Sequence, residues 1–174
     1  MKLELKKIYT NERFSEETTC FRADLYLNGK KVGYAENDGR GGCTNYNRYP
    51  PLEYSVIQEI EEYCKTLPPI VYESYLGRNE KIDMTLEHWI DDQIEKHLKK
   101  KADKKIERDY DKGICYGTNY SYRIVTFKKG GKKLTINQML CNEKDSDFLM
   151  KSIKKLRDEN QTILNTNIPT YMLG

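Results

Sequence analysis

The feature that most constrains the fold of this 174-residue chain is the dipeptide Asn28-Gly29, which stands between two apolar, alternating segments. Asn-Gly is the strongest short-range signal for a two-residue type I′ hairpin, because both turn residues adopt positive φ. Residues 21–28 and 30–36 are therefore predicted to form antiparallel strands. We expect residues 3–9 to form a further strand of the same sheet.

The alternation of side chains predicts the register of this hairpin. With Asn28-Gly29 as the turn, Leu25 faces Val32 and Ala23 faces Tyr34. A period of two then places five residues on one face of the sheet: Phe21, Ala23, Leu25, Val32 and Tyr34.

A second hairpin is predicted around Gly130-Gly131, between residues 120–129 and 132–137. Its register pairs apolar residues across the strands, Phe127 with Leu134 and Val125 with Ile136. Four lysines then lie at an exposed tip: Lys128, Lys129, Lys132 and Lys133.

Helical periodicity predicts three helices, over residues 52–65, 85–109 and 145–160. Because the strands cluster in hairpins, the expected class is α+β, with an antiparallel sheet built from two hairpins and about three helices on one face. We expect a single domain over 1–174, with residues 165–174 as a loose, polar tail.

Composition narrows the class of protein further. Hydrophobic residues make up 37% of the chain and charged residues 33%, which is compatible with a folded core. No apolar run approaches the roughly 18 residues that span a bilayer, so we expect a cytoplasmic protein with no membrane partner. The five cysteines include no Cys-x-x-Cys pair, which favours free thiols over disulfides or zinc.

A glycine-rich segment follows the first hairpin and is the preferred candidate for a binding site. Its glycines allow backbone N–H groups to form an anion-binding nest, to which the Arg40 guanidinium would add paired hydrogen bonds. A nucleotide or another anion is the expected ligand, although a tight turn needs the same residue types. The predicted binding residues are Asn37, Asp38, Gly39, Arg40, Gly41, Gly42, Tyr46 and Arg48.

Residues 25–42, with the sequence LYLNGKKVGYAENDGRGG, resemble a segment of small uncharacterised proteins of bacteriophages and mobile elements. The resemblance covers about a tenth of the chain and implies no activity. It suggests, by analogy, a counter-defence inhibitor or a sponge for nucleotide signals that acts in the host cytoplasm on a host protein or a nucleotide.

Nucleic-acid binding is the first alternative. Residues 1–90 carry a net charge of −3 and residues 91–174 a net charge of +6. Lysines recur along one ridge of the second helix, and more lie at the hairpin tip, which gives the candidate set Lys96, Lys100, Lys104, Lys129 and Lys132. Interleaved acids along the helix favour a merely solvated face instead.

A metal-dependent hydrolase is the second alternative, built on Asp24, Glu36 or Asp38. His88 and His97 are nine residues apart on one helix, so they point to opposite sides and cannot share a metal from that helix. No catalytic motif is present and no cofactor is indicated, so a non-enzymatic binding protein is preferred. The sequence leaves the catalytic residues and the oligomeric state open.

Overall fold

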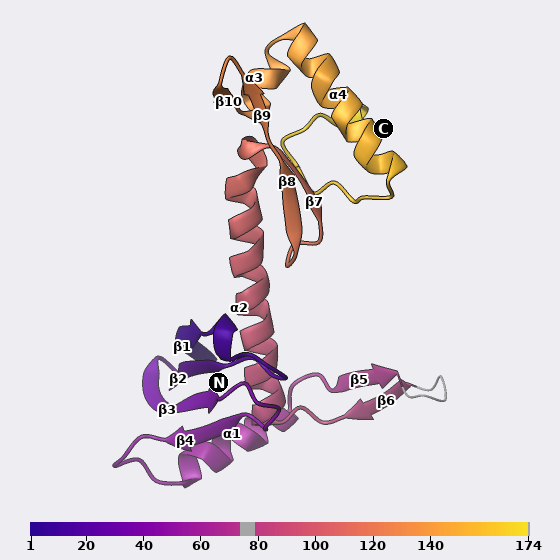
Figure 1. Ribbon diagram of the computed structural model, residues 1–174. Coiled ribbons are helices and arrows are strands. Elements are labelled where there is room, and N and C mark those ends of the chain that lie inside the picture. Colours follow the sequence, from indigo (N-terminus) through magenta and orange to yellow (C-terminus); the bar gives the residue numbers. More distant parts are fainter. Residues whose placement is uncertain (74–78, 174) are drawn as a thin grey trace. The chain divides into compact units, whose positions relative to one another are not determined.

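The computed structural model describes residues 1–73 and 79–173 and confirms the α+β class. The chain divides into two compact units, Met1–His97 (unit 1) and Leu98–Gly174 (unit 2). The boundary falls inside α2 (Leu86–Asp109), the long helix in Figure 1. Because units are defined by packing and domains by independent folding, the expected single domain stays a prediction.

Unit 1 is built on a four-stranded antiparallel sheet with the strand order β1-β2-β3-β4. The expected strand over residues 3–9 is confirmed as β1, which pairs with β2. Figure 1 shows the sheet with α1 beside β4. The elements of unit 1, before α2, are β1 (Leu3–Thr10), the 3-10 helix η1 (Glu12–Phe14), β2 (Phe21–Leu27), β3 (Lys30–Asn37), β4 (Asn45–Arg48), α1 (Ser55–Lys65), β5 (Ile70–Glu73) and β6 (Asn79–Ile82).

The first hairpin has the predicted turn but not the predicted register. Leu27 faces Lys30 as expected, and then a β-bulge shifts the pairing, so that Leu25 faces Gly33. The extra residue sends Tyr34 to the opposite face, where it lies beside Arg22. Gly33 accounts for the close approach of β4, because a Cβ atom there would collide with the carbonyl oxygen of Asn47. The predicted placement of Tyr34 on the face of Phe21, Ala23 and Leu25 is therefore wrong.

The core of unit 1 lies on the face of the sheet that Phe21, Ala23 and Leu25 share with Ala35. Helices contribute the buried side chains Ile57, Ile60, Cys64, Leu86, Ile90 and Ile94. Hydrogen bonds connect β4 and the residue before it to the helices: Tyr46 Oη donates to Glu61 (2.7 Å), Thr44 Oγ1 donates to Asp91 (2.6 Å) and the Thr44 N–H donates to Glu87 (3.0 Å). Burial raises the pKa of the Asp91 carboxyl group.

Unit 2 contains two separate two-stranded sheets. The second predicted hairpin is one of them, whereas the first belongs to the four-stranded sheet of unit 1, so the two predicted hairpins do not share one sheet. The tip register is confirmed, with Lys132 facing Lys129 and Leu134 facing Phe127. After the end of α2, its elements are the 3-10 helix η2 (Tyr110–Lys112), β7 (Ile114–Gly117), β8 (Tyr122–Val125), β9 (Phe127–Lys129), β10 (Lys132–Leu134), α3 (Ile136–Leu140), α4 (Glu143–Asp158) and α5 (Thr170–Leu173).

The predicted pair of Val125 with Ile136 is wrong. Val125 pairs instead with Ile114 in the β7–β8 hairpin, and Ile136 is the first residue of α3. Thr135 ends the extended chain, because its side chain forms a capping box with Gln138 and so starts a helix.

The expected loose tail is also wrong for residues 165–173. Ile168 and Met172 are buried in one core with Leu149 and Ile153 of α4. Asn165 is 4% exposed, and its side-chain amide bonds to backbone groups around β7. Only three of the nine residues 165–173 are buried, namely Asn165, Ile168 and Met172, so the sequence of this segment reads as polar. These three residues nevertheless attach it to unit 2.

Candidate nucleic-acid interface

The glycine-rich segment forms a closed turn whose amides are already bonded within the protein. Asn37 is buried, and its amide group donates to the Gly42 carbonyl oxygen (2.9 Å). Three successive N–H groups have side-chain acceptors: Gly39 bonds to Asn37 (2.8 Å), Arg40 to Asp38 (3.1 Å) and Gly41 to Thr18 (3.3 Å). The prediction of an open nest of backbone amides is therefore wrong.

The same turn fills a concavity made by another segment. The Gly39 carbonyl oxygen accepts hydrogen bonds from the backbone N–H groups of residues 16, 17 and 18. A Cβ atom at position 39 would collide with Phe14, and φ is +88°, so only glycine fits without strain. Both observations indicate a structural connection between the η1 loop and the end of β3.

Of the remaining predicted binding residues, Tyr46 and Arg48 already have side-chain partners, whereas the Arg40 side chain has none in the described part of the chain. Tyr46 is bonded to Glu61, and the Arg48 guanidinium lies 4.3 Å from the centre of the Tyr54 ring. The Arg40 side chain is exposed and has no bonded partner among residues 1–73 and 79–173. Anion binding at this loop now depends on Arg40 alone and stays a prediction.

A cavity of about 370 Å³ lies beside the turn, and its lining does not favour an anion. Glu36 and Asp38 are the charged residues that line it, together with Phe21, Asn37, Gly42, Cys43 and Asn45. Both carboxylates would repel a phosphate group.

The carboxylates proposed for a hydrolase do not form a metal site in the described part of the chain. Asp24 is paired with Lys31 (2.8 Å) and accepts a hydrogen bond from Tyr49. The Lys31 ammonium group holds the pKa of Asp24 below its usual value. Within residues 1–73 and 79–173, no three His, Cys, Asp or Glu side chains are placed to hold one ion.

The division into two units separates the charges of the chain more sharply than its sequence halves do. Unit 1 carries 13 Lys and Arg against 18 Asp and Glu, a net charge of −5. Unit 2 carries 17 against 9, a net charge of +8. A basic surface on an otherwise near-neutral protein is the electrostatic footprint of polyanion binding.

Exposure increases this imbalance at the surface of unit 2. All 17 basic side chains of the unit are exposed, but only 5 of its 9 acidic side chains are. The other four acidic residues are partly buried: Asp103, Asp109, Asp111 and Asp145. The surface that a ligand meets is therefore more positive than the net charge of the unit.

Each partly buried acid has a partner within unit 2. Asp103 accepts from the Asn119 side chain, Asp109 from Tyr122, Asp111 from the backbone of Asn137, and Asp145 from Lys129. The alternation of acids and lysines along distal α2, which suggested a mixed, solvated helix, therefore separates in space. Asp103, Asp109 and Asp111 contact the rest of the unit, whereas Glu107 is exposed like the lysines.

The five lysines of the predicted interface are not equivalent. Lys100, Lys104 and Lys132 are exposed and unpaired among residues 1–73 and 79–173. Lys129 pairs with Asp145 (2.7 Å). Lys96 belongs to unit 1 and pairs with Asp92, so its charge is largely compensated. Sequence reasoning missed the further exposed cations of unit 2 on α4, namely Lys144, Lys151, Lys154, Lys155 and Arg157.

Asp109 is the acid whose removal we expect to affect unit 2 most. The neighbouring Lys112 and Tyr122 donate hydrogen bonds to it, and both lower the pKa of its carboxyl group. Burial, together with the bond to Asp109, raises the pKa of Tyr122 to about 12. Asp109→Ala should lower the free energy of unfolding by about 1–2 kcal/mol at neutral pH, because the Tyr122 hydroxyl loses a charged acceptor.

The stabilisation by Asp109 depends on its ionisation. A lowered folded-state pKa means that the stabilisation is complete above the unfolded pKa of about 4 and is lost as pH falls through the folded value. Denaturant unfolding at pH 7 and pH 3 should show a difference between wild type and variant that shrinks in acid. Glu107→Ala, at an exposed position of the same helix, is the control, and an equal loss in both variants would contradict the assignment.

Comparisons with known proteins found no match to any family model, to any curated protein or to any solved structure. The resemblance of residues 25–42 to phage and mobile-element proteins therefore stays a prediction. Among the described residues, no helix is both long enough and apolar enough to cross a membrane.

Proposed function

We propose that this protein binds nucleic acid without sequence specificity, through the lysine-rich surface of unit 2. The observation that carries the proposal is the contrast in that unit between 17 exposed basic side chains and 5 exposed acidic ones. Binding is proposed to be non-enzymatic: Glu36 and Asp38 line one cavity, but no three His, Cys, Asp or Glu side chains of the described residues are placed around one ion.

Lysine suits phosphate contact rather than base recognition. Its ammonium group is a point charge on a flexible stem, so it follows a phosphate backbone but carries little sequence information. Each lysine–phosphate contact releases condensed counterions, which makes the affinity strongly dependent on salt. Nucleic acid is therefore a better match than a neutral protein surface.

The β9–β10 hairpin supports the same function. Its strands have three residues each, and two of the three cross-strand pairs are lysine opposite lysine: Lys129 with Lys132 and Lys128 with Lys133. Like charges that face each other directly destabilise a hairpin. Asp145 compensates Lys129, whereas no acid among residues 1–73 and 79–173 pairs with Lys128 or Lys133. A phosphate backbone at the tip would remove this repulsion.

Fluorescence anisotropy with a labelled 20-base-pair duplex tests the proposal. We expect binding at low salt that weakens steeply between about 50 and 200 mM salt, because several phosphate contacts are made. Unlabelled duplex should compete, and ATP at the same phosphate concentration should not. Absence of binding at low salt, or competition by ATP that Arg40→Ala abolishes, would contradict the proposal and favour the loop over residues 37–42.

A further inference from the structure

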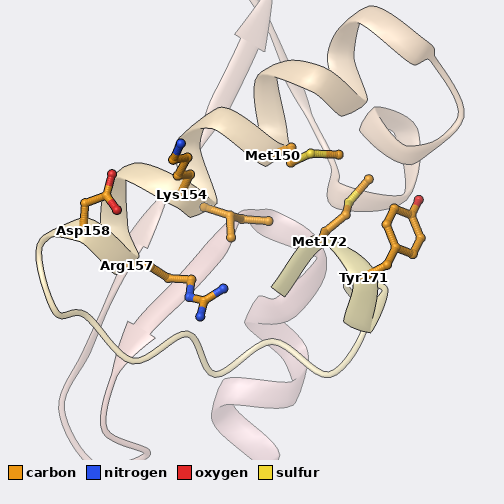
Figure 2. A pocket seen from close by; sticks show the side chains of 7 residues that line it. Met150, Lys154, Arg157, Asp158, Tyr171 and Met172 are labelled. Atoms are coloured by element: carbon orange, nitrogen blue, oxygen red, sulfur yellow. The ribbon is translucent and has the colours of Figure 1, made fainter. Parts of the chain in front are cut away.

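A pocket of about 470 Å³ lies between α4 and α5 in unit 2 (Figure 2). Cavities that hold small ligands begin at about 300 Å³, so the space is large enough for one nucleotide. Its lining comes from one face of α4, at spacings of three and four residues, and from α5: Met150, Ile153, Lys154, Arg157, Asp158, Tyr171 and Met172.

The pocket is held open by contacts that fix α5. Met172 is 4% exposed and packs in the core with Ile153, which forms the floor of the cavity. The Arg157 guanidinium donates a hydrogen bond to the Leu173 carbonyl oxygen. These two contacts place Tyr171 at the rim, where its side chain is 72% exposed.

The lining changes from apolar to charged along α4. Met150, which is 40% exposed, lies near Met172 and Tyr171, and Figure 2 shows Lys154, Arg157 and Asp158 toward the other end. Met150 and Arg157 are seven residues apart, which corresponds to about 10 Å along a helix. A ligand that matches this pocket has a flat apolar part joined to an anionic part.

The Tyr171 ring is open to such a ligand. In the described chain, the four tyrosines that carry a cation over the ring all lie in unit 1: Tyr26, Tyr34, Tyr49 and Tyr54, at 4.1 to 5.2 Å from cation to ring centre. Those pairs occupy the π faces on which a base would stack. Tyr171 has no such pair, although its unit holds the larger number of cations.

We infer that this pocket binds one unpaired nucleotide of a single strand, with the base on Tyr171 and Met150 and the adjoining phosphate at Lys154 and Arg157. The inference rests on the proposed nucleic-acid binding and gives it a preference for single strands or frayed ends. A base inside a duplex is stacked on both sides and cannot reach the ring, whereas an unpaired base can.

The experiment compares a 20-nucleotide single strand with a blunt 20-base-pair duplex for the full chain and three variants. Tyr171→Ala should weaken single-strand binding about tenfold, because one stacked base is lost, and should change duplex binding by less than twofold. Tyr171→Phe keeps the ring and should bind as wild type does. Tyr120→Ala removes a similarly exposed tyrosine of unit 2, at 65%, and should have no effect.

Asp158→Asn supplies a second readout with the opposite sign. Removal of the carboxylate that lines the pocket should tighten single-strand binding about twofold or more, because a phosphate is no longer repelled. The pocket assignment would be overturned, with the proposed function intact, if Tyr171→Ala weakened single-strand and duplex binding equally. The same holds if an acidic peptide displaced the single strand as well as an unlabelled single strand does. Loss of all nucleic-acid binding in wild type would overturn both.

Discussion

Asn165→Ala should lower the free energy of unfolding of unit 2 by about 3 kcal/mol, since several buried backbone groups would lose their partner together. The side-chain Oδ1 of Asn165 accepts from the Cys115 N–H (2.6 Å), and its Nδ2 donates to the backbone carbonyl oxygens of Tyr110 (2.9 Å) and Gly113 (3.1 Å). The side chain joins η2, the start of β7 and the C-terminal segment. An alanine side chain can neither accept nor donate these bonds, and at 4% exposure the site leaves little access for solvent to replace them.

Urea unfolding, followed by far-ultraviolet circular dichroism, measures this effect. Asn167→Ala is the matched control, because Asn167 bonds to Asn165 (3.0 Å) but lies closer to the surface. We expect the control to lose less than about 1 kcal/mol. A loss at Asn165 as small as that of the control would mean that the C-terminal segment is held mainly by Ile168 and Met172.

Replacement by glutamine of four lysines of unit 2 that pair with no acid in the described part of the chain should weaken duplex binding about a hundredfold at low salt, because up to four phosphate contacts are lost. The residues are Lys100, Lys104, Lys132 and Lys133, all exposed. Their removal should leave the fold unchanged or slightly stabilised, because both like-charge pairs of the hairpin disappear.

The matched control removes the same number of charges from unit 1. Glutamine at Lys7, Lys30, Lys65 and Lys81, which are also exposed, gives a chain of identical net charge. If binding depends on the surface of unit 2, this control should bind within about threefold of wild type. Equal weakening of both variants would show that only the net charge of the chain matters.

The first hairpin shows how far local sequence determines this fold. Asn28-Gly29 specifies the turn, and the turn forms where it is predicted. The bulge in β3 was not predictable from the hairpin alone, because it depends on the close approach of β4 to Gly33. A signal was present in the glycine itself, since an isolated glycine within a strand often marks a bulge.

The sequence predicted part of the candidate interface, because local composition identifies basic residues but not their distant partners. The lysines of α2 and of the Gly130-Gly131 tip could be identified by composition and spacing. Their separation from the acids could not, because Asp103 and Asp111 are withdrawn by partners 16 and 26 residues away in the chain. The closed turn at residues 37–42 was missed for the same reason, since Thr18 and the η1 loop occupy its polar groups.

The most direct test of the interface is the slope of log Kd against log salt for duplex binding. Each phosphate contact contributes about 0.9 to the slope, so we predict a wild-type slope of about 4 or more and a slope about 3 units lower for the four-lysine variant of unit 2. The unit 1 control should keep the wild-type slope. The same slope for wild type and the unit 2 variant would contradict the account.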